Sequence, residues 1–398
     1  MQPAIVPTTM KAVVIHDDEA LVKSDVPVAT YIPEGHMLIK TVAVAMNTSE
    51  WKHIDLKLAK NGAIMGCDVV GQVILMGSPT LSEFARRKSD PNATGDNAIE
   101  PQQFKVGDYV YAFVHGSSNK NPQNGALAEY VVVDSATTYL ASPNWKSVDP
   151  SVSSIPVGPV NSLEAAVSLP VSLTTAGGIL FHDFPNKLLW EPAEPQNNFP
   201  LLVWGGATGV GLLLIQLAKR THAYTKIIAV ASRSHEAMLR TFGADDVFDY
   251  HDADVVQQIR AKYPDIQHLV DAVSEQSTIR QVYKCASETL PVTIMQLVFL
   301  SIEDIEPHDR RDNVKIISTL IYSVTGDEVP IGDYTFPPNP IYRRDVARFV
   351  NFIAPHIQQG GIYNMPVRIT RQGLDNAPEL IDLLRKGKVR GEKLVSVL

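Results

Sequence analysis

One segment near the middle of the chain constrains the fold more than any other. Four apolar residues, Leu201 to Trp204, lead into a glycine-rich stretch from Gly205 to Gly211. The uncharged run continues to Ala218 and is long enough to be considered as a membrane span, but its four glycines favour a turn. A buried strand, a glycine turn and then a helix predict a site for a dinucleotide pyrophosphate, because the start of a helix offers free N–H groups and a positive dipole end.

The glycine stretch departs in one place from the G-x-G-x-x-G fingerprint. Gly206 and Gly211 hold its first and last places, whereas Thr208 holds the middle one. A glycine cluster alone is also compatible with a plain structural turn. Its place between a predicted strand and a predicted helix favours a dinucleotide site. The predicted coenzyme contacts in this turn are Gly206, Ala207, Thr208, Gly209 and Val210.

The end of the next predicted strand indicates which nicotinamide coenzyme binds. NAD-binding sites usually offer Asp or Glu there to the ribose hydroxyls, whereas this chain offers Ser232 and Arg233. A guanidinium can hold a 2′-phosphate through paired N–H donors, and a serine hydroxyl can add another. The alternative is that Arg233 only covers the following helix. The sequence therefore predicts NADPH.

The residues around this motif alternate between strand and helix patterns. Predicted strands are 201–204, 226–230, 247–248, 268–271 and 293–299, and predicted helices are 210–220, 234–241, 254–262 and 277–285. This alternation predicts an α/β fold with a doubly wound parallel sheet of the Rossmann type.

The first part of the chain has a different pattern, with short β-rich runs separated by turns. Predicted strands are 11–15, 37–44, 69–75, 109–114 and 127–133, which indicate a partly open β-barrel. The polar stretch between Gly77 and Gln103 has no periodicity and predicts a surface insertion. Apolar residues at helical spacing predict a long helix over 345–358, and 393–397 reads as a strand that returns to the first domain.

Charge and cysteine content exclude several classes of protein. The formal net charge is −8, with 43 acidic and 35 basic residues, which disfavours nucleic acid as a partner. Two cysteines, Cys67 and Cys285, are too few for a disulfide framework. Charges interrupt the apolar run in residues 1–25, so no secretory signal or membrane anchor is predicted. We expect a cytoplasmic protein, and without an entry signal the glycosylation sequons at Asn47 and Asn92 are expected to be accidental.

Five further short sequence motifs lie along the chain in an order and spacing that identify a protein family. They are 10–14 (MKAVV), 104–110 (FKVGDYV), 125–130 (GALAEY), 169–176 (LPVSLTTA) and 391–395 (GEKLV). With the glycine turn, the chain resembles the medium-chain dehydrogenase/reductase superfamily over nearly its full length. It is most similar to zinc-lacking members such as fungal enoyl reductases, quinone oxidoreductase-like proteins and yeast alcohol-dehydrogenase-like proteins. The resemblance implies a GroES-like β-barrel catalytic domain (1–160 with 340–398), a Rossmann domain (161–339) and an active site in the cleft between them.

The resemblance also indicates that no metal is bound. Zinc-dependent relatives carry a Cys, a Gly-His-Glu and a second Cys, where this chain has Asn47, Gly66-Cys67-Asp68 and the apolar region of Leu173. One thiolate cannot hold a tetrahedral zinc with an open position. His53 and His115 could add ligands, but a single histidine near a β-rich core is more often packed or solvated.

Residues 47–52 resemble the family loop that runs beside the nicotinamide. Lys52 is the candidate for stabilising the developing negative charge on the substrate oxygen, and Asn47 for contacting nicotinamide or substrate. A surface lysine is, however, often only solvated. The further coenzyme contacts that the resemblance implies are Thr48, Trp51, Thr174, Thr175, Tyr250, Leu297, Val298 and Lys393; Tyr250 could equally be core packing.

The predicted reaction is therefore NADPH-dependent reduction of an activated small-molecule carbonyl compound without zinc. A conjugated alkene and a reactive aldehyde both remain open as the reduced group. Two further functions also stay open, a trans-acting enoyl reductase on carrier-bound chains and an NADPH-binding protein without catalysis. The sequence does not decide the oligomeric state, and a homodimer stays open.

Overall fold

The computed structural model describes residues 6–77, 99 and 101–398. The chain divides into two compact units, residues 1–171 with 322–398 and residues 172–321. The expected domain ranges, 1–160 with 340–398 and 161–339, remain a prediction. Most of the expected insertion, together with the sequon at Asn92, lies outside the described residues.

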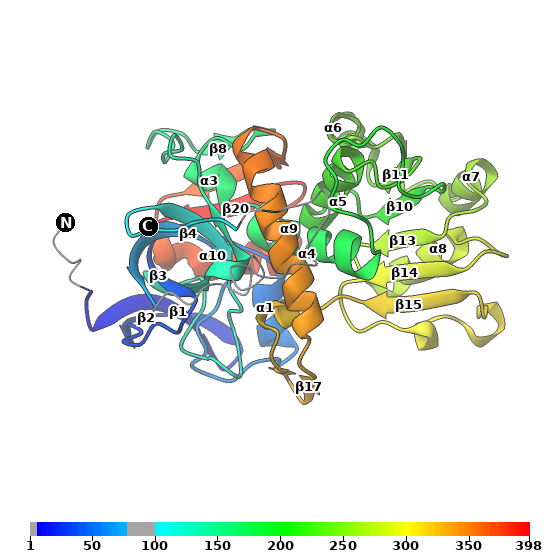
Figure 1. Cartoon of the computed structure of the whole chain (residues 1–398). Coiled ribbons are helices and arrows are strands. Elements are labelled where there is room, and N and C mark those ends of the chain that lie inside the picture. Colours follow the sequence, from blue (N-terminus) through cyan, green and yellow to red (C-terminus); the bar gives the residue numbers. More distant parts are fainter. Residues whose placement is uncertain (1–5, 78–98, 100) are drawn as a thin grey trace, which may run out of the picture. The chain divides into compact units, whose positions relative to one another are not determined.

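Unit 172–321 is built on a six-stranded sheet in which every neighbouring pair is parallel. Its strands are β10 (Leu201–Trp204), β11 (Ile227–Val230), β12 (Asp246–Phe248), β13 (His268–Asp271), β14 (Val292–Gln296) and β15 (Val314–Ser318). Their spatial order is β12-β11-β10-β13-β14-β15 (Figure 1). This is the doubly wound order, with the topological switch between β10 and β13, where open α/β sheets bind ligands.

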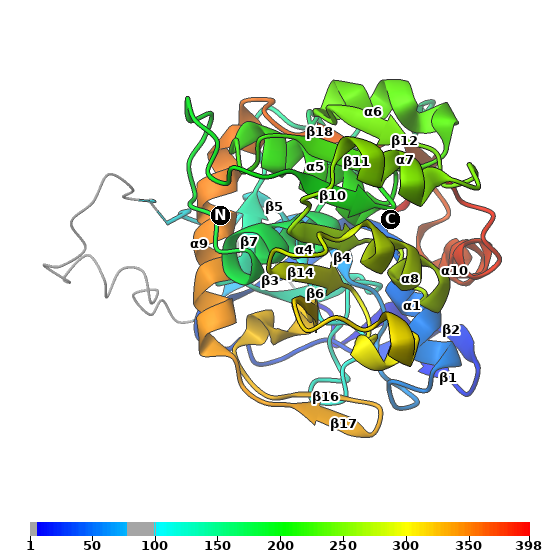
Figure 2. The ribbon, with the colours of Figure 1, turned by 90° about the vertical axis from the view of Figure 1, so that its right-hand side faces the viewer.

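Helices cover both faces of this sheet. They are α5 (Gly209–Arg220), α6 (Glu236–Phe242), α7 (Val255–Lys262) and α8 (Gln276–Cys285), with α4 (Pro170–Gly178), the π-helical turn η2 (Ile179–Asp183) and the 3-10 turns η3 (Arg233–His235), η4 (Ile302–Asp304) and η5 (Pro307–Asp309). Ile228 and Val230 belong to one apolar core with residues of α7 and α8. Because side chains alternate along a strand, Ala229 faces the other way, toward α5 and α6. Figure 2 gives a second view of these elements.

Unit 1–171 with 322–398 is built on an eight-stranded, largely antiparallel sheet. Its strands are β3 (His36–Ala45), β4 (Asp68–Met76), β5 (Tyr109–Phe113), β6 (Tyr130–Asp134), β7 (Thr138–Leu140), β8 (Ser154–Ile155), β19 (Val367–Thr370) and β20 (Lys393–Val397). The C-terminal strand β20 pairs antiparallel with β3 and parallel with β19. The last strand of the chain is thereby placed beside one of the first, as the sequence predicts.

Smaller elements complete this unit. The strand pairs are β1 (Thr9–His16) with β2 (Glu19–Pro27), β9 (Gly158–Pro159) with β18 (Tyr363–Asn364) and β16 (Val329–Ile331) with β17 (Tyr334–Phe336). The helices are α1 (Thr48–Asp55), α3 (Leu163–Ala166), α9 (Pro340–Gln358) and α10 (Ala377–Arg385), with 3-10 turns η1 (Ser135–Thr137), η6 (Ile321–Thr325) and η7 (Gly373–Asn376). The apolar core holds Met37, Leu38, Ile54 and Leu127.

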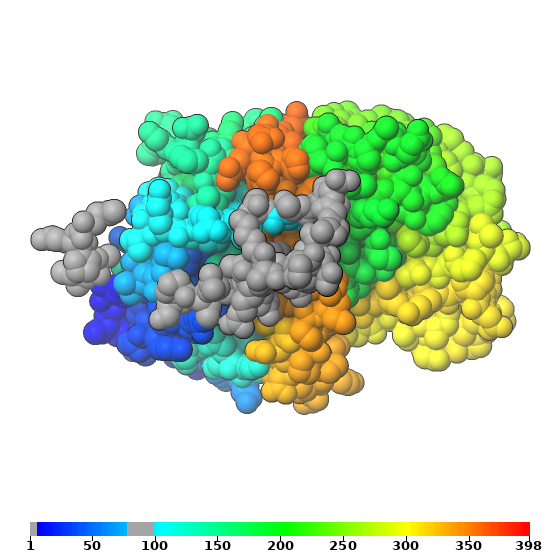
Figure 3. All heavy atoms as spheres, in the orientation of Figure 1, coloured from blue at the N-terminus to red at the C-terminus, as the bar shows by residue number. Residues whose placement is uncertain are grey.

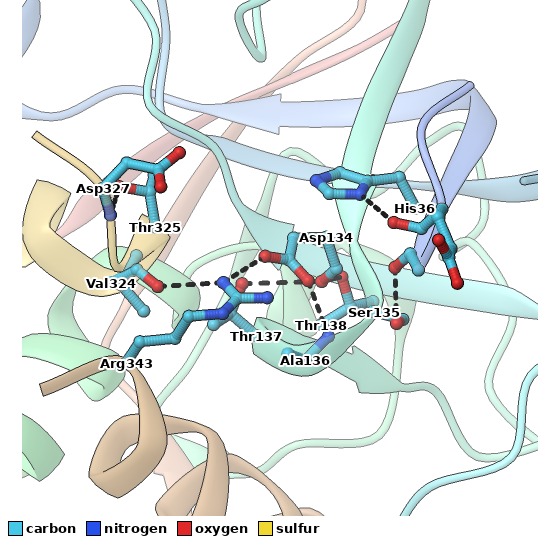
Figure 4. Close-up of polar contacts among 12 residues, drawn as sticks. His36, Asp134, Ser135, Ala136, Thr137, Thr138, Val324, Thr325, Asp327 and Arg343 are labelled. Atoms are coloured by element: carbon cyan, nitrogen blue, oxygen red, sulfur yellow. Dashed lines mark hydrogen bonds and ion pairs between the residues drawn. The ribbon is translucent and has the colours of Figure 1, made fainter. Parts of the chain in front are cut away.

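Helix α9 is fixed to the sheet by an ion pair that is largely shielded from water. Arg343 donates to the Asp134 carboxylate at 2.5 Å and to the Val324 carbonyl at 3.1 Å (Figure 4). Asp134 also accepts the N–H of Ala136 at 2.9 Å, at the start of η1. Other side chains of α9, drawn in orange in Figure 3, reach the surface.

The sequence predicts β10 to β14, the helices α5 to α8 between them, α9, and the strands β1, β3, β4, β5, β6 and β20, but it does not predict β2 or the helices α1, α3, α4 and α10. The strand predicted over 293–299 ends at Gln296, because the Gln296 side chain accepts the Val298 N–H at 2.6 Å and turns the chain. The long helix begins at Pro340 rather than near Asp345, with Asn339 capping it. The sixth parallel strand, β15, is not predicted at all. The uncharged run 201–218 is a strand, a turn and a helix. Among the residues that the structure describes, none of the helices has the length and hydropathy of a membrane span.

Candidate active site and coenzyme site

In the glycine turn after β10, the backbone at the start of α5 packs directly against the backbone at the end of the strand. Gly205 has φ +82°, a left-handed conformation that favours glycine. A Cβ on Gly211 would lie 2.3 Å from the Gly205 carbonyl oxygen, so only glycine allows α5 to pack this closely on the strand. The two glycines therefore make a tight turn and close packing between helix and strand.

Thr208, at the middle place of the fingerprint, caps α5. Its hydroxyl donates to the Gly205 carbonyl at 2.8 Å and accepts the Gly211 N–H at 3.1 Å. Among the described residues, no acceptor contacts the N–H groups of Gly209 and Val210, which open the helix and are partly exposed. A dinucleotide pyrophosphate fits such a turn, because it supplies acceptor oxygens and negative charge at the helix start. The threonine replaces a glycine without closing the turn to a phosphate.

Other predicted coenzyme residues follow the carboxyl ends of the parallel strands. Ser232 and Arg233 follow β11, Tyr250 follows β12, and Leu297 and Val298 follow β14. In a parallel sheet these strand ends share one edge, which is also the edge of the glycine turn. Thr174 and Thr175 lie on α4 and are buried. The structure thus gathers most of the predicted coenzyme residues of this unit at one edge.

Arg233 is exposed and already has acidic neighbours. Its guanidinium donates to Asp252 at 3.0 Å, and its backbone N–H donates to Asp249 at 3.0 Å. The N–H and ring of His251 also donate to Asp249 and, with that backbone bond, hold the pKa of the carboxyl down at about 2. Tyr250 is 48% exposed and its ring contacts the His251 ring at a tilt of 34°, so the alternative that Tyr250 is core packing is wrong.

Unit 1–171 with 322–398 holds the remaining predicted residues, on and around α1. Asn47 is the N-cap of this helix, and Thr48, Trp51 and Lys52 lie on it. The Lys52 ammonium lies 5.7 Å from the centre of the Trp51 ring, within the range of a cation–π contact, and the residue is only partly exposed. Lys52 is therefore not a freely solvated surface lysine.

A buried ion pair holds the start of α1. The Lys393 ammonium, on β20, donates to Asp68 of β4 at 2.8 Å and to the Asn47 side-chain oxygen at 2.5 Å. The Asn47 amide in turn donates to Asp68 at 2.9 Å, and the other Asp68 oxygen accepts the Val171 N–H at 2.7 Å. The side chains of Lys393 and Asp68 are 7% and 0% exposed. In this structure Lys393 and Asn47 bind each other, and their contact with the coenzyme stays a prediction.

Glu50, a buried residue of α1 itself, is a second acidic group near the start of this helix. One of its oxygens accepts the Asn47 N–H at 2.5 Å, and the other is buried with no hydrogen-bond partner in the described part of the chain. Burial raises the pKa of Glu50 to about 8, against the opposing effects of the Asn47 bond and the Lys393 charge. Glu50 is therefore largely protonated at neutral pH.

An aromatic and thiol cluster surrounds Tyr322. The His115 ring stacks on Tyr322 with centroids 4.0 Å apart, and the His53 ring meets it edge-on at 5.6 Å. The Cys67 sulfur lies 3.9 Å from the Tyr322 hydroxyl and 3.7 Å from the Ser49 hydroxyl. Burial raises the pKa of the Cys67 thiol and lowers the pKa of His115 to about 3, with His53 adding to the latter. The thiol and the imidazole are thus both uncharged.

Comparisons with known proteins agree with this geometry. A family model of the alcohol dehydrogenase GroES-like domain matches residues 33–143, and a model of the zinc-binding dehydrogenase matches residues 209–327. An uncharacterized protein of Saccharomyces cerevisiae is 47% identical over 395 residues, which cover 99% of both chains. A trans-enoyl reductase of Aspergillus niger is 30% identical, with 98% of both chains covered. The chain belongs to the medium-chain dehydrogenase/reductase superfamily.

A solved structure confirms the fold of this medium-chain dehydrogenase/reductase. The quinone oxidoreductase of Pseudomonas syringae superposes with a TM-score of 0.66 at 15% identity, covering 98% of this chain and 100% of that one. The predicted α/β fold, a GroES-like curled sheet and a Rossmann sheet, is confirmed. The predicted membership of the zinc-lacking branch agrees with the enoyl reductase and quinone oxidoreductase relatives.

In this oxidoreductase, the residues at the positions of the zinc ligands of zinc-dependent relatives contact other side chains of the protein. Asn47 contacts the Lys393 ammonium, Cys67 lies against Ser49 and Tyr322, and Leu173 is buried and apolar. Within residues 6–77, 99 and 101–398, no three His, Cys, Asp or Glu side chains gather so as to hold a metal ion.

Several site residues are not predicted by the sequence. The sequence assigns no role to Glu50, Asp68 or Tyr322, and it indicates His53, Cys67 and His115 only as candidate metal ligands. The spacing of Glu50, His53 and Ile54 gives one local signal, because it places three residues on the buried side of α1. No local pattern connects Cys67 with Tyr322, which lies 255 residues further along the chain.

Proposed function

We propose that this medium-chain oxidoreductase uses NADPH, without zinc, to reduce activated carbonyl compounds. The substrate would be an α,β-unsaturated carbonyl compound reduced at its C=C bond or a reactive aldehyde reduced at C=O. The observation that carries the proposal is the Lys393 ammonium, which contacts Asn47 and Asp68 where zinc-dependent relatives bind their metal. A cation from the chain itself thus neutralises the acidic group at this position.

The residues at the coenzyme turn support NADPH. The N–H groups of Gly209 and Val210 would bind the pyrophosphate, and Arg233 and Ser232 would bind the 2′-phosphate. Arg233 is exposed, and its contact with Asp252 is a surface ion pair that an incoming phosphate can replace. Bound NADPH supplies a hydride, that is, two electrons and one proton, and leaves as NADP⁺.

The chain's own residues would stabilise the charge that the hydride creates. A hydride added to the β-carbon of an enal moves an electron pair onto the carbonyl oxygen, and a proton then adds to the α-carbon. Lys52 lies on α1 with its ammonium near the Trp51 ring, and we assign it the stabilisation of that oxygen. Such charge stabilisation suits a conjugated alkene, because the enolate formed by hydride addition spreads its negative charge over oxygen and the α-carbon, and solvent can supply the proton afterwards.

The function is tested with NADPH and NADH in parallel against 2-hexenal, a quinone and a simple aldehyde. Consumption of NADPH with 2-hexenal is expected, and product analysis separates hexanal (C=C reduction) from hexenol (C=O reduction). Activity that disappears with chelators and returns with zinc would contradict the zinc-independent mechanism. NADPH binding without turnover of any of these compounds would instead favour a non-catalytic role.

A second candidate is reduction of chains bound to a carrier protein, favoured by the trans-enoyl reductase relatives. A 2-enoyl pantetheine thioester and the matching free enal distinguish the two. A kcat/KM at least about tenfold higher for the thioester would support the carrier-bound substrate.

Lys52 gives a direct test of the proposed mechanism. Lys52→Met should lower kcat about 100-fold, the lower range for a positioned polar or acid–base group, with little change in NADPH affinity. Steady-state kinetics and a coenzyme titration measure both. Lys60→Met, at an exposed position in the same unit, is the matched control and should stay within twofold. Equal loss in both variants would exclude the role of Lys52.

A further inference from the structure

Three side chains of α1 carry a buried polar atom that has no hydrogen-bond partner among the residues that the structure describes. They are the Glu50 Oε1, the Trp51 Nε1 and the His53 Nε2 atoms. Nearly all buried polar atoms in proteins are hydrogen-bonded, so three such atoms on a helix of eight residues call for an occupant. The helix also carries Lys52, to which the proposed function assigns the substrate oxygen.

The hydrogen bond of His53 decides what its free nitrogen can bind. The Nδ1 atom lies 2.8 Å from the Ser49 carbonyl oxygen. A carbonyl can only accept, so Nδ1 carries the hydrogen. Burial lowers the pKa of His53, which keeps the ring neutral at pH 7. The Nε2 atom is therefore a buried acceptor that needs a donor.

Glu50 presents the opposite group on the same side of the helix. Its Oε2 atom accepts the Asn47 N–H, so in the protonated acid the hydrogen resides on Oε1. Residues three apart face the same way on a helix, and both side chains are buried. A hydroxyl is the simplest group that can donate to His53 and accept from Glu50.

The cluster around His53 continues toward the surface. The His53 ring contacts Tyr322, Tyr322 stacks on His115, and His115 is only partly buried. The His53 Nε2 atom is itself shielded from solvent, and the partly exposed member of this cluster is His115.

We propose that His53 Nε2 accepts a hydrogen bond from a hydroxyl group of the substrate, so that the enzyme prefers hydroxylated unsaturated carbonyl compounds. The inference rests on the proposed function, since it names the substrate class for the same site. It makes His53 a specificity residue, distinct from Lys52, which acts on the carbonyl oxygen. A structural water at Nε2 would give no such preference.

The test compares 2-pentenal with 4-hydroxy-2-pentenal, which differ by one hydroxyl. In the native enzyme with NADPH, kcat/KM should be about tenfold higher for the hydroxylated compound. His53→Leu should reduce this ratio to about one by slowing only the hydroxylated substrate. His53→Gln keeps an acceptor and should restore part of the preference. His36→Leu is the matched control, because the His36 ring also bonds a carbonyl, that of Glu34 at 2.9 Å, in the same unit.

A ratio of one in the native enzyme, or a preference that survives in His53→Leu, would overturn the inference while leaving the proposed reduction intact. If neither aldehyde is reduced, the proposed function fails, and binding decides the inference separately. With NADP⁺ no hydride is available, so calorimetry measures binding of each aldehyde alone. Tighter binding of the hydroxylated compound that His53→Leu abolishes supports the site. Equal binding of the two aldehydes refutes it.

Discussion

The glycine turn of one unit and helix α1 of the other differ in where their polar groups lie and in what holds them. The turn, residues 205–211, presents backbone N–H groups at the surface and uses one side chain, Thr208, as a cap. Side chains from distant strands, a buried ammonium and a buried carboxylate, hold the start of helix α1. Three buried polar atoms of α1 itself have no hydrogen-bond partner within the described residues. The donors in the turn are backbone N–H groups, which suit a negatively charged ligand. The position of α1, by contrast, depends on a buried ammonium and a buried carboxylate that neutralise each other.

This difference predicts how each region fails. The turn should be sensitive to the size of its side chains, because a single methyl group on Gly211 would prevent the close packing of α5 on β10. Around α1, the sensitive property is charge, because a buried ion that loses its partner cannot be hydrated. Substitutions should therefore cost most in free energy around α1 and affect coenzyme binding most selectively at the turn and its neighbours.

The largest effect is expected from breaking the buried ion pair. Lys393→Met leaves Asp68 charged and buried, and should lower the free energy of unfolding by about 3–5 kcal/mol. Urea unfolding followed by circular dichroism measures the change. Lys120→Met breaks an exposed ion pair with Asp327 in the same unit and should cost less than about 1 kcal/mol. Similar losses in both variants would remove the contrast between buried charge and surface charge.

The second effect is a pH dependence from Glu50. Its folded pKa, about 8, is above the value of 4.5 for an unperturbed carboxyl group. Between pH 4.5 and 8 the unfolded chain releases this proton while the folded chain keeps it, so stability falls as pH rises across that window. The total is on the order of a few kcal/mol. Glu50→Gln should remove this slope in unfolding curves measured at a series of pH values; parallel curves would refute it.

A third, smaller effect tests space at the turn. Gly211→Ala puts a methyl group 2.3 Å from the Gly205 carbonyl oxygen. The resulting shift should cost about 1–3 kcal/mol and weaken NADPH binding, measured by thermal unfolding and coenzyme fluorescence. A Cβ on Gly158 meets nothing within 4 Å, so Gly158→Ala is the control and should bind NADPH normally. Unchanged affinity in Gly211→Ala would mean that the coenzyme does not depend on this turn.

The smallest and most selective effect is expected at Arg233. Arg233→Ala should raise the KM for NADPH roughly tenfold and leave the KM for NADH unchanged, because only NADPH carries the 2′-phosphate. Kinetics with both coenzymes measure this. Arg240→Ala removes another exposed arginine, paired with Glu236 on α6, and should affect neither coenzyme. An equal rise in KM for both coenzymes would assign Arg233 a structural role.

The two regions also differ in how far the sequence reveals them. The strand, turn and helix at 201–220 are contiguous, so apolar runs and glycines predict them within a residue. The same holds for β13 and β20. Strand β15 is not predicted, because its residues 314–318 mix buried and exposed positions without a clear period. Tyr322 is not predicted as a site residue because its partners, Cys67 and His115, lie more than 200 residues away.

The glycine turn and five of the six Rossmann strands can be predicted from the amino-acid sequence, because backbone geometry and short-range hydrophobic spacing depend on residues that are adjacent in the chain. Asn47 and Lys52 are indicated through resemblance to a family loop. The contacts of Lys393 with Asp68 and Asn47, and the buried acceptor of His53 that has no partner among the described residues, become visible only in the folded chain. A buried charge or lone pair is defined by the atoms that surround it in space, and strands β4 and β20 meet helix α1 only after the chain has folded.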